Sequence, residues 1–182
     1  MNNIQVSTLK DSFGRVVWTH KVHEKQAEIY SVWADVLDWA TVIFSAFTSA
    51  ALLYVLLKPE TRLTVSVIFS FLALIVRLLQ LVFSPRIKRD AHKSTAKQLW
   101  NIKERYINLI ADAISNSIST EQIIQKRDAL TNELSLLYST ALQTSPFAMR
   151  LATKALKAKD EHTFYEKEVE NFLPFGLRGD GK

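Results

Sequence analysis

Side chains with chemistry of their own are few in this chain of 182 residues. His20, His23 and Glu24 fall within one helical turn, but a helical zinc-hydrolase motif places its two histidines four positions apart. His92 and His162 are isolated in the sequence. The absence of cysteine excludes disulfides, thiol catalysis and cysteine-ligated metals. We therefore expect no metal site and no cofactor.

Enzyme motifs are also missing from the sequence. There is no glycine-rich phosphate loop, no nucleophile elbow and no pair of acids in an apolar setting. Three acids near the end, Glu166, Glu168 and Glu170, are typical of a solvated helix face. We expect a protein that is not an enzyme.

Polar side chains instead follow a helical spacing inside two apolar runs, residues 39–57 and 63–84. Within each run they recur at intervals of three or four, or their sum, which places them on one helix face. We call this set the polar stripe; its members are Thr41, Ser45, Thr48, Ser66, Ser70, Arg77, Gln80 and Ser84. Such a stripe either lines a pore between several copies or lets helices pack closely.

Arg77 is the one charged member of the polar stripe, and it allows three interpretations. Its long side chain reaches toward lipid headgroups, lines a polar interior of an oligomer, or pairs with Asp38 or Asp35. In a water-filled path, a ring of such arginines would favour anions or hold the path shut.

The two apolar runs are long enough to cross a membrane. At about 1.5 Å of rise per residue, each covers the roughly 30 Å of bilayer hydrocarbon. The link of residues 58–62 contains Pro59 and permits only an immediate reversal, so the spans should be antiparallel. The alternative is a buried helical hairpin of a soluble bundle, which rarely carries such apolar sequence on every face.

Basic residues predict the orientation, since lysine and arginine remain on the cytoplasmic side. Directly after the second run come Arg86, Lys88, Arg89, Lys93 and Lys97. Both termini should then be cytoplasmic, and no cleaved signal peptide is expected. We divide the chain into a cytoplasmic lead and entering helix (1–38), a transmembrane hairpin (39–84) and a cytoplasmic helical region (85–182).

The net charge of +5 invites comparison with nucleic-acid-binding proteins. The basic residues that follow the second run explain much of it, and their natural partner is the anionic lipid surface. We expect the lipid bilayer as a partner and no direct binding of nucleic acid.

Glycine and proline are rare, four of each, and they do not interrupt the helical patterns. We expect one helix from about Trp18 into the first span, a break at Pro85, and a helix to about Ile118. Ser119 with Gln122 predicts a capped helix, and Ser145 before Pro146 predicts another, to about Lys157. The fold class is an all-α membrane protein: a two-helix transmembrane hairpin with a cytoplasmic helical bundle.

The end of the chain predicts a short helix that folds back as a latch over residues 163–178. Thr163 with Glu166 has the spacing of a helix cap, and Gly176 permits a turn. The apolar residues and the proline that would hold the latch on the bundle are Phe164, Val169, Phe172, Leu173 and Pro174.

This layout resembles the SLATT family. The resemblance covers nearly the whole chain and includes the tail from Thr163 to Arg178. It implies a membrane effector of bacterial conflict systems associated with nucleotide-synthesising and nucleotide-sensing proteins, in which members form pores or otherwise compromise the inner membrane. We expect this chain to be the effector domain alone, triggered by a separately encoded nucleotide-synthesising enzyme, reverse transcriptase or sensor.

The sequence and the resemblance together predict a multi-pass protein of the bacterial inner membrane. It should form a homo-oligomer and act as a pore-forming effector in antiviral defence by abortive infection. Two other functions stay open: a non-conducting adaptor that recruits a partner through residues 90–178, and a small ion-channel or transporter subunit.

Overall fold

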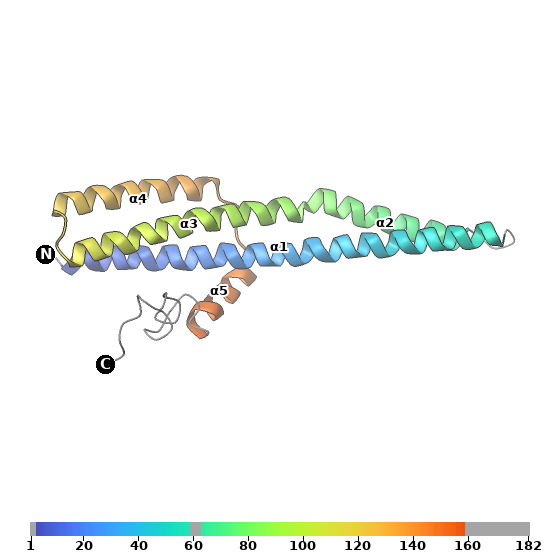
Figure 1. Ribbon diagram of the computed structural model, residues 1–182, viewed down its shortest axis with the longest axis horizontal. Coiled ribbons are helices and arrows are strands. Elements are labelled where there is room, and N and C mark those ends of the chain that lie inside the picture. The colour runs from blue at the N-terminus through green and yellow to red at the C-terminus, as the bar shows by residue number, and fades with distance from the viewer. Residues whose placement is uncertain (1–2, 59–62, 159–182) are drawn as a thin grey trace, which may run out of the picture.

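One helix organises the fold. In the computed structural model, which describes residues 3–58 and 63–158, α1 (Asn3–Leu57) runs along the whole length of the molecule (Figure 1). Its sequence contains no proline and a single glycine, Gly14, so nothing in it breaks the helical hydrogen bonds. The prediction of one helix entering the apolar run is confirmed, although α1 begins at Asn3 and not near Trp18.

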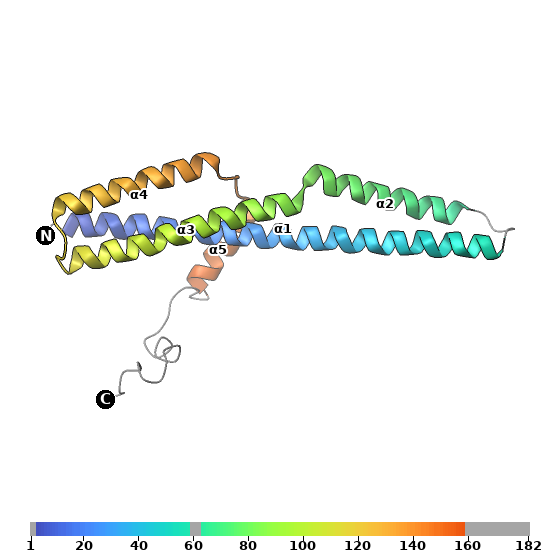
Figure 2. The same ribbon diagram turned by 45° about the horizontal axis from the view of Figure 1, so that its top comes forward.

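The chain returns along α1 in two helices, α2 (Thr64–Phe83) and α3 (Pro85–Ile114). Ser84 joins them in a left-handed conformation with φ 43° and ψ 52°, and its N–H donates to the carbonyl of Gln80 at 3.0 Å. Pro85 has no N–H and occupies the first turn of α3. The predicted break at Pro85 is confirmed, and Figure 2 shows the chain stepping sideways between α2 and α3.

A short connection turns the chain into α4 (Thr120–Thr140). α3 ends at Ile114, earlier than the predicted Ile118, and Asn116 takes a positive φ of 53° in the turn. The predicted capping box is present: Ser119 Oγ accepts from the N–H of Gln122, whose side chain accepts from the N–H of Ser119. α4 lies beside α3 at the end of the molecule that carries the N-terminus (Figure 1).

The last described helix, α5 (Pro146–Ala158), packs against α1. Ser145 precedes it and accepts a hydrogen bond from the N–H of Ala148 at 3.2 Å, as its predicted capping role requires. The backbone N–H of Ser145 donates to Gln26 Oε1 of α1 at 2.8 Å. This contact fixes the start of α5 against the middle of α1.

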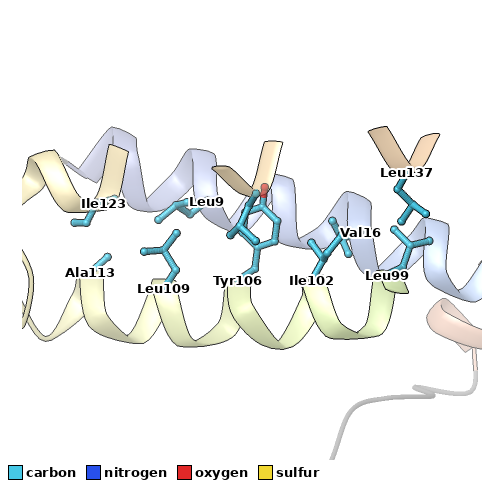
Figure 3. Close-up of a cluster of buried hydrophobic side chains, with 10 residues drawn as sticks. Leu9, Val16, Leu99, Ile102, Tyr106, Leu109, Ala113, Ile123 and Leu137 are labelled. Atoms are coloured by element: carbon cyan, nitrogen blue, oxygen red, sulfur yellow. The ribbon is translucent and has the colours of Figure 1, made fainter. Parts of the chain in front are cut away.

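A single apolar core joins α1, α3 and α4 at the end remote from the apolar runs (Figure 3). Tyr106, Leu99 and Ile102 of α3 are at most 1% exposed. The remaining fully buried members are Leu9, Val16, Leu109, Ala113, Ile123, Leu130 and Leu137. The spacing of three, four or seven along each helix, predicted for α3 and α4, therefore forms the core of a three-helix bundle.

A smaller core fixes α5 against α1. Val22 is buried against Ala148 and Ala152, and Ile29 packs partly on them. Trp33 and Val36 continue the same spacing along α1 but are 58% and 52% exposed, because α5 does not extend that far. No strand occurs in residues 3–58 or 63–158, and the fold class is all-α as predicted.

Candidate functional site: an exposed hairpin with a polar stripe

The hairpin formed by the second half of α1 and by α2 exposes nearly all of its apolar surface. Both helices are long and apolar enough to cross a membrane, by length and composition. In the most apolar 18-residue stretch of α1, no residue is buried. In the corresponding stretch of the second apolar helix, 11% of the residues are buried. Side chains this apolar and this exposed require lipid or another protein as their surroundings.

Four members of the polar stripe lie between the two helices. Thr41, Thr48 and Gln80 are half-buried and Ser66 is buried. The hydroxyls of Thr41 and Thr48 donate to the carbonyls of Leu37 and Phe44, one turn earlier, at 2.9 and 2.8 Å. Bonding to the helix's own backbone makes a hydroxyl tolerable in an apolar setting.

Three other members lie at the open edge of the hairpin: Ser45, Ser70 and Arg77 are exposed. A hollow of about 550 Å³ on this edge is lined by Thr48, Ser66 and Ser70, together with apolar side chains. A second hollow of about 440 Å³ contains Arg77 and Gln80. The second hollow continues past the end of α2 onto Pro85, Arg86 and Ile87 of α3.

A charged cluster closes the wider end of the hairpin, next to the junction of α2 and α3. Gln80 Nε2 donates to Asp38 Oδ1 at 3.1 Å and to Thr41 Oγ1 at 3.2 Å. Arg77 donates to Gln80 Oε1 at 3.0 Å, and Arg86 forms a short ion pair with Asp38. Arg77 is thus linked to Asp38 through Gln80, while the direct ion pair of Asp38 is with Arg86.

Histidines form a buried cluster between α1 and α3, on the bundle side of this junction. His23 Nδ1 and His92 Nδ1 lie 2.9 Å apart, so one ring donates its N–H and the other accepts. Tyr30 stacks on His92 with ring centres 5.6 Å apart. His20 Nδ1 lies 2.9 Å from the carbonyl oxygen of Ala96.

The surroundings of His23 and His92 favour their neutral imidazoles. Burial, followed by the proximity of His92 and His20, lowers the pKa of His23 from 6.5 to about 4. Burial lowers the pKa of His92 as well. Glu24 lies 3.5 Å from His20 and 2.9 Å from the ammonium of Lys21, and the pKa of this carboxyl falls to about 2. Glu24 is therefore ionised at neutral and mildly acidic pH.

The described part of the chain contains no group of three or more side chains arranged to hold a metal ion. The pairing of His23 with His92 uses the ring nitrogens in a hydrogen bond. The latch residues predicted from the sequence, Phe164, Val169, Phe172, Leu173 and Pro174, lie outside the described residues.

Comparison with known families identifies the family of this chain. Residues 6–168 fit the SMODS and SLOG-associating 2TM effector domain family 4. The chain belongs to the SLATT family. The match spans both apolar helices, the bundle and α5, so the resemblance seen in the sequence is confirmed. No curated protein and no solved structure matches the chain.

Membership in the SLATT family agrees with the exposed hairpin, because its name describes a two-transmembrane effector domain. Exposed apolar helices and this family together identify the chain as a membrane protein with an effector domain.

Sequence reasoning missed two contacts of this SLATT chain: the ion pair of Arg86 with Asp38 and the pairing of His23 with His92. A signal for the second was present. His20 and His23 share the helical spacing of the buried residues Val16 and Ala27, which would have placed both rings in the interior.

Proposed function

We propose that this protein is a membrane effector of a bacterial antiviral conflict system, which oligomerises and makes the inner membrane permeable when triggered. The observation that carries the proposal is the arrangement of the hairpin: two apolar helices, each with a row of polar residues on the same side. The SLATT family provides the effector role and the expected association with a separate trigger protein.

A single hairpin does not enclose a water-filled path. Ser45 and Ser70 are exposed at its open edge, where lipid hydrocarbon would leave their hydroxyls without external partners. Several hairpins arranged in a closed ring would turn this edge toward a common centre and expose the apolar back to lipid. The hydroxyl-bearing members of the polar stripe, such as Ser45 and Ser70, then line the path.

The proposed orientation places both termini in the cytoplasm. The basic residues 86–97 directly follow the apolar helix α2, and such clusters remain on the cytoplasmic side. The bundle of α1, α3 and α4 would then face the cytoplasm, where a trigger protein is encountered.

The experiment compares two substitutions that introduce the same side chain on opposite sides of α2. Ser70→Phe fills the polar edge, whereas Ile68→Phe enlarges the apolar back, where Ile68 is 53% exposed. Both proteins are overproduced in bacteria, and membrane potential and survival are measured. We expect Ser70→Phe to abolish depolarisation and killing, and Ile68→Phe to retain both at equal membrane levels. Equal activity of the two variants would contradict a path along the polar stripe.

An adaptor is the second candidate, favoured by apolar side chains exposed on the cytoplasmic helices. Leu136 of α4 is 71% exposed and Phe147 of α5 is 60% exposed. Residues of this kind on a bundle surface fit a partner interface. An adaptor would depolarise cells only with its partner present, and it would tolerate Ser70→Phe.

A further inference from the structure

The hollow at the junction of α2 and α3 is lined partly by charged side chains and partly by apolar ones. Arg77 and Arg86 supply guanidinium groups, while Leu81 and Ile87 supply apolar surface and are 73% and 71% exposed. Asp38 is the acid in this lining, so the charged groups of the hollow sum to one positive charge. A binding site with a cationic part and an adjoining apolar part suits an amphiphile with an anionic head.

The position of the hollow along the hairpin matches the headgroup layer of a membrane. Asp38 is the last charged residue before the apolar run of α1, and Arg86 is the first after α2. Trp39, beside Asp38, is 68% exposed, as is typical of an aromatic residue at a membrane interface. Arg77 lies six residues before the end of α2 and bonds to Gln80, toward this layer.

We propose that this hollow binds the phosphate of an anionic phospholipid between Arg77 and Arg86, with an acyl chain along Leu81. Arginine forms paired, charge-assisted hydrogen bonds to phosphate oxygens, and basic pockets beside membrane helices recognise such headgroups. The site requires that the hairpin spans the membrane but does not require that it conducts.

Asp38 regulates access to the site. Its carboxylate already pairs with Arg86, whose side chain is 65% exposed, and exposed ion pairs contribute little to stability. A lipid phosphate therefore competes with Asp38 for the guanidinium of Arg86. Arg77, held by the neutral side chain of Gln80, keeps donors for a second anion.

In this proposal, Arg77 lies in the headgroup layer of the membrane. The wall of the proposed path is then formed by the serine and threonine hydroxyls of the polar stripe. The two proposals therefore fail separately. If lipid does not bind, Ser70→Phe is still expected to abolish depolarisation. If Ser70→Phe does not abolish depolarisation, the lipid is still expected to bind.

Direct lipid binding to the purified full chain tests the proposal. Native mass spectrometry from detergent measures the affinity for phosphatidylglycerol and for phosphatidylcholine. We expect Arg86→Gln and Arg77→Gln each to weaken phosphatidylglycerol binding about tenfold, as the loss of one charge-assisted contact implies. Arg89→Gln, which removes a neighbouring arginine outside the hollow, should change it less than about twofold.

Asp38→Asn separates a lipid site from a merely structural ion pair. Removing the competing carboxylate should tighten phosphatidylglycerol binding by about threefold or more, whereas loss of a structural pair would weaken it. Circular dichroism confirms that each variant is folded.

Three outcomes would overturn the proposal: unchanged affinity of folded Arg86→Gln, equal affinity for the two lipids, or weaker binding by Asp38→Asn. Competition by inorganic phosphate at millimolar concentration would also overturn it, because the site would then take a soluble anion.

Discussion

At the scale of single residues, the paired imidazoles of His23 and His92 are the groups most sensitive to acid. Their rings are 4% and 1% exposed and share one hydrogen bond, which protonation of both would break. The nearby carboxylate of Glu24 is already paired with the ammonium of Lys21. Protonation of the pair therefore has no ready counter-charge.

The first prediction concerns pH. The folded pKa of His23, about 4, lies below its ordinary value of 6.5, so the unfolded chain binds the proton more readily. The stability is fully present above pH 6.5 and is lost as the pH falls from 6.5 toward 4. We expect the melting temperature of the protein in detergent to drop by about 6 to 12 °C over this range through His23 alone.

His23→Gln provides the control for this pH effect, since glutamine retains a polar side chain but does not titrate. The variant should be less stable at neutral pH and show a flatter decline in acid. An equally steep decline would mean that other groups govern the acid sensitivity.

At the scale of helices, Gly14 is the weak point of α1. It lies in the interior of the helix, and a Cβ at this position would meet no atom within 4 Å. Gly14→Ala should therefore raise the free energy of unfolding by about 0.5 to 1 kcal/mol, because alanine loses less backbone entropy. Chemical denaturation followed by circular dichroism measures this gain; a destabilised variant would contradict the open space beside Gly14.

The boundaries of the helices could be predicted where the signal is local. Pro85, the pair Ser119 and Gln122, and the pair Ser145 and Pro146 each fix a helix start through their own backbone chemistry. The partners of each face could not be predicted in the same way. Trp33 has the spacing of a buried residue, but its exposure depends on where α5 begins along α1, which is a property of the packed molecule.

The candidate site also has features that the sequence predicts and features that only the packed structure determines. The polar stripe follows from helical spacing alone, whereas the distinction between its inner members, such as Ser66, and its outer members, such as Ser70, requires the crossing of α1 and α2. The ion pair of Arg86 with Asp38 depends on the step at Ser84, whose left-handed conformation has no sequence signal as strong as glycine.

At the scale of the whole molecule, we predict assembly into a closed ring or bundle. The exposed polar edge of the hairpin and the exposed apolar residues of α4 and α5 both require neighbours. Mass photometry in mild detergent should show a defined oligomer. A monomer over a wide range of protein concentration would count against assembly.

The final prediction concerns the tail. Residues 163–182 contain large apolar side chains that a free end would expose to water, and a latch formed by Phe164, Phe172 and Leu173 would control how copies meet. Deleting this segment should change killing by at least about tenfold or alter the mass of the assembly. A truncated protein that matches the full chain in both measurements would remove the latch from the mechanism.

The molecule has one continuous helix, α1, on one side and two joined helices, α2 and α3, on the other, and this difference affects how motion passes along it. α1 is a single strut of about 80 Å that joins the bundle to the far end of the hairpin, whereas the opposite side is jointed at Ser84 and Pro85. Because α1 is continuous, a rotation of the bundle would reach the hairpin along α1. The joint at Ser84 and Pro85 interrupts the same route through α3 and α2. A trigger that twists the bundle would thus rotate the apolar half of α1 relative to α2.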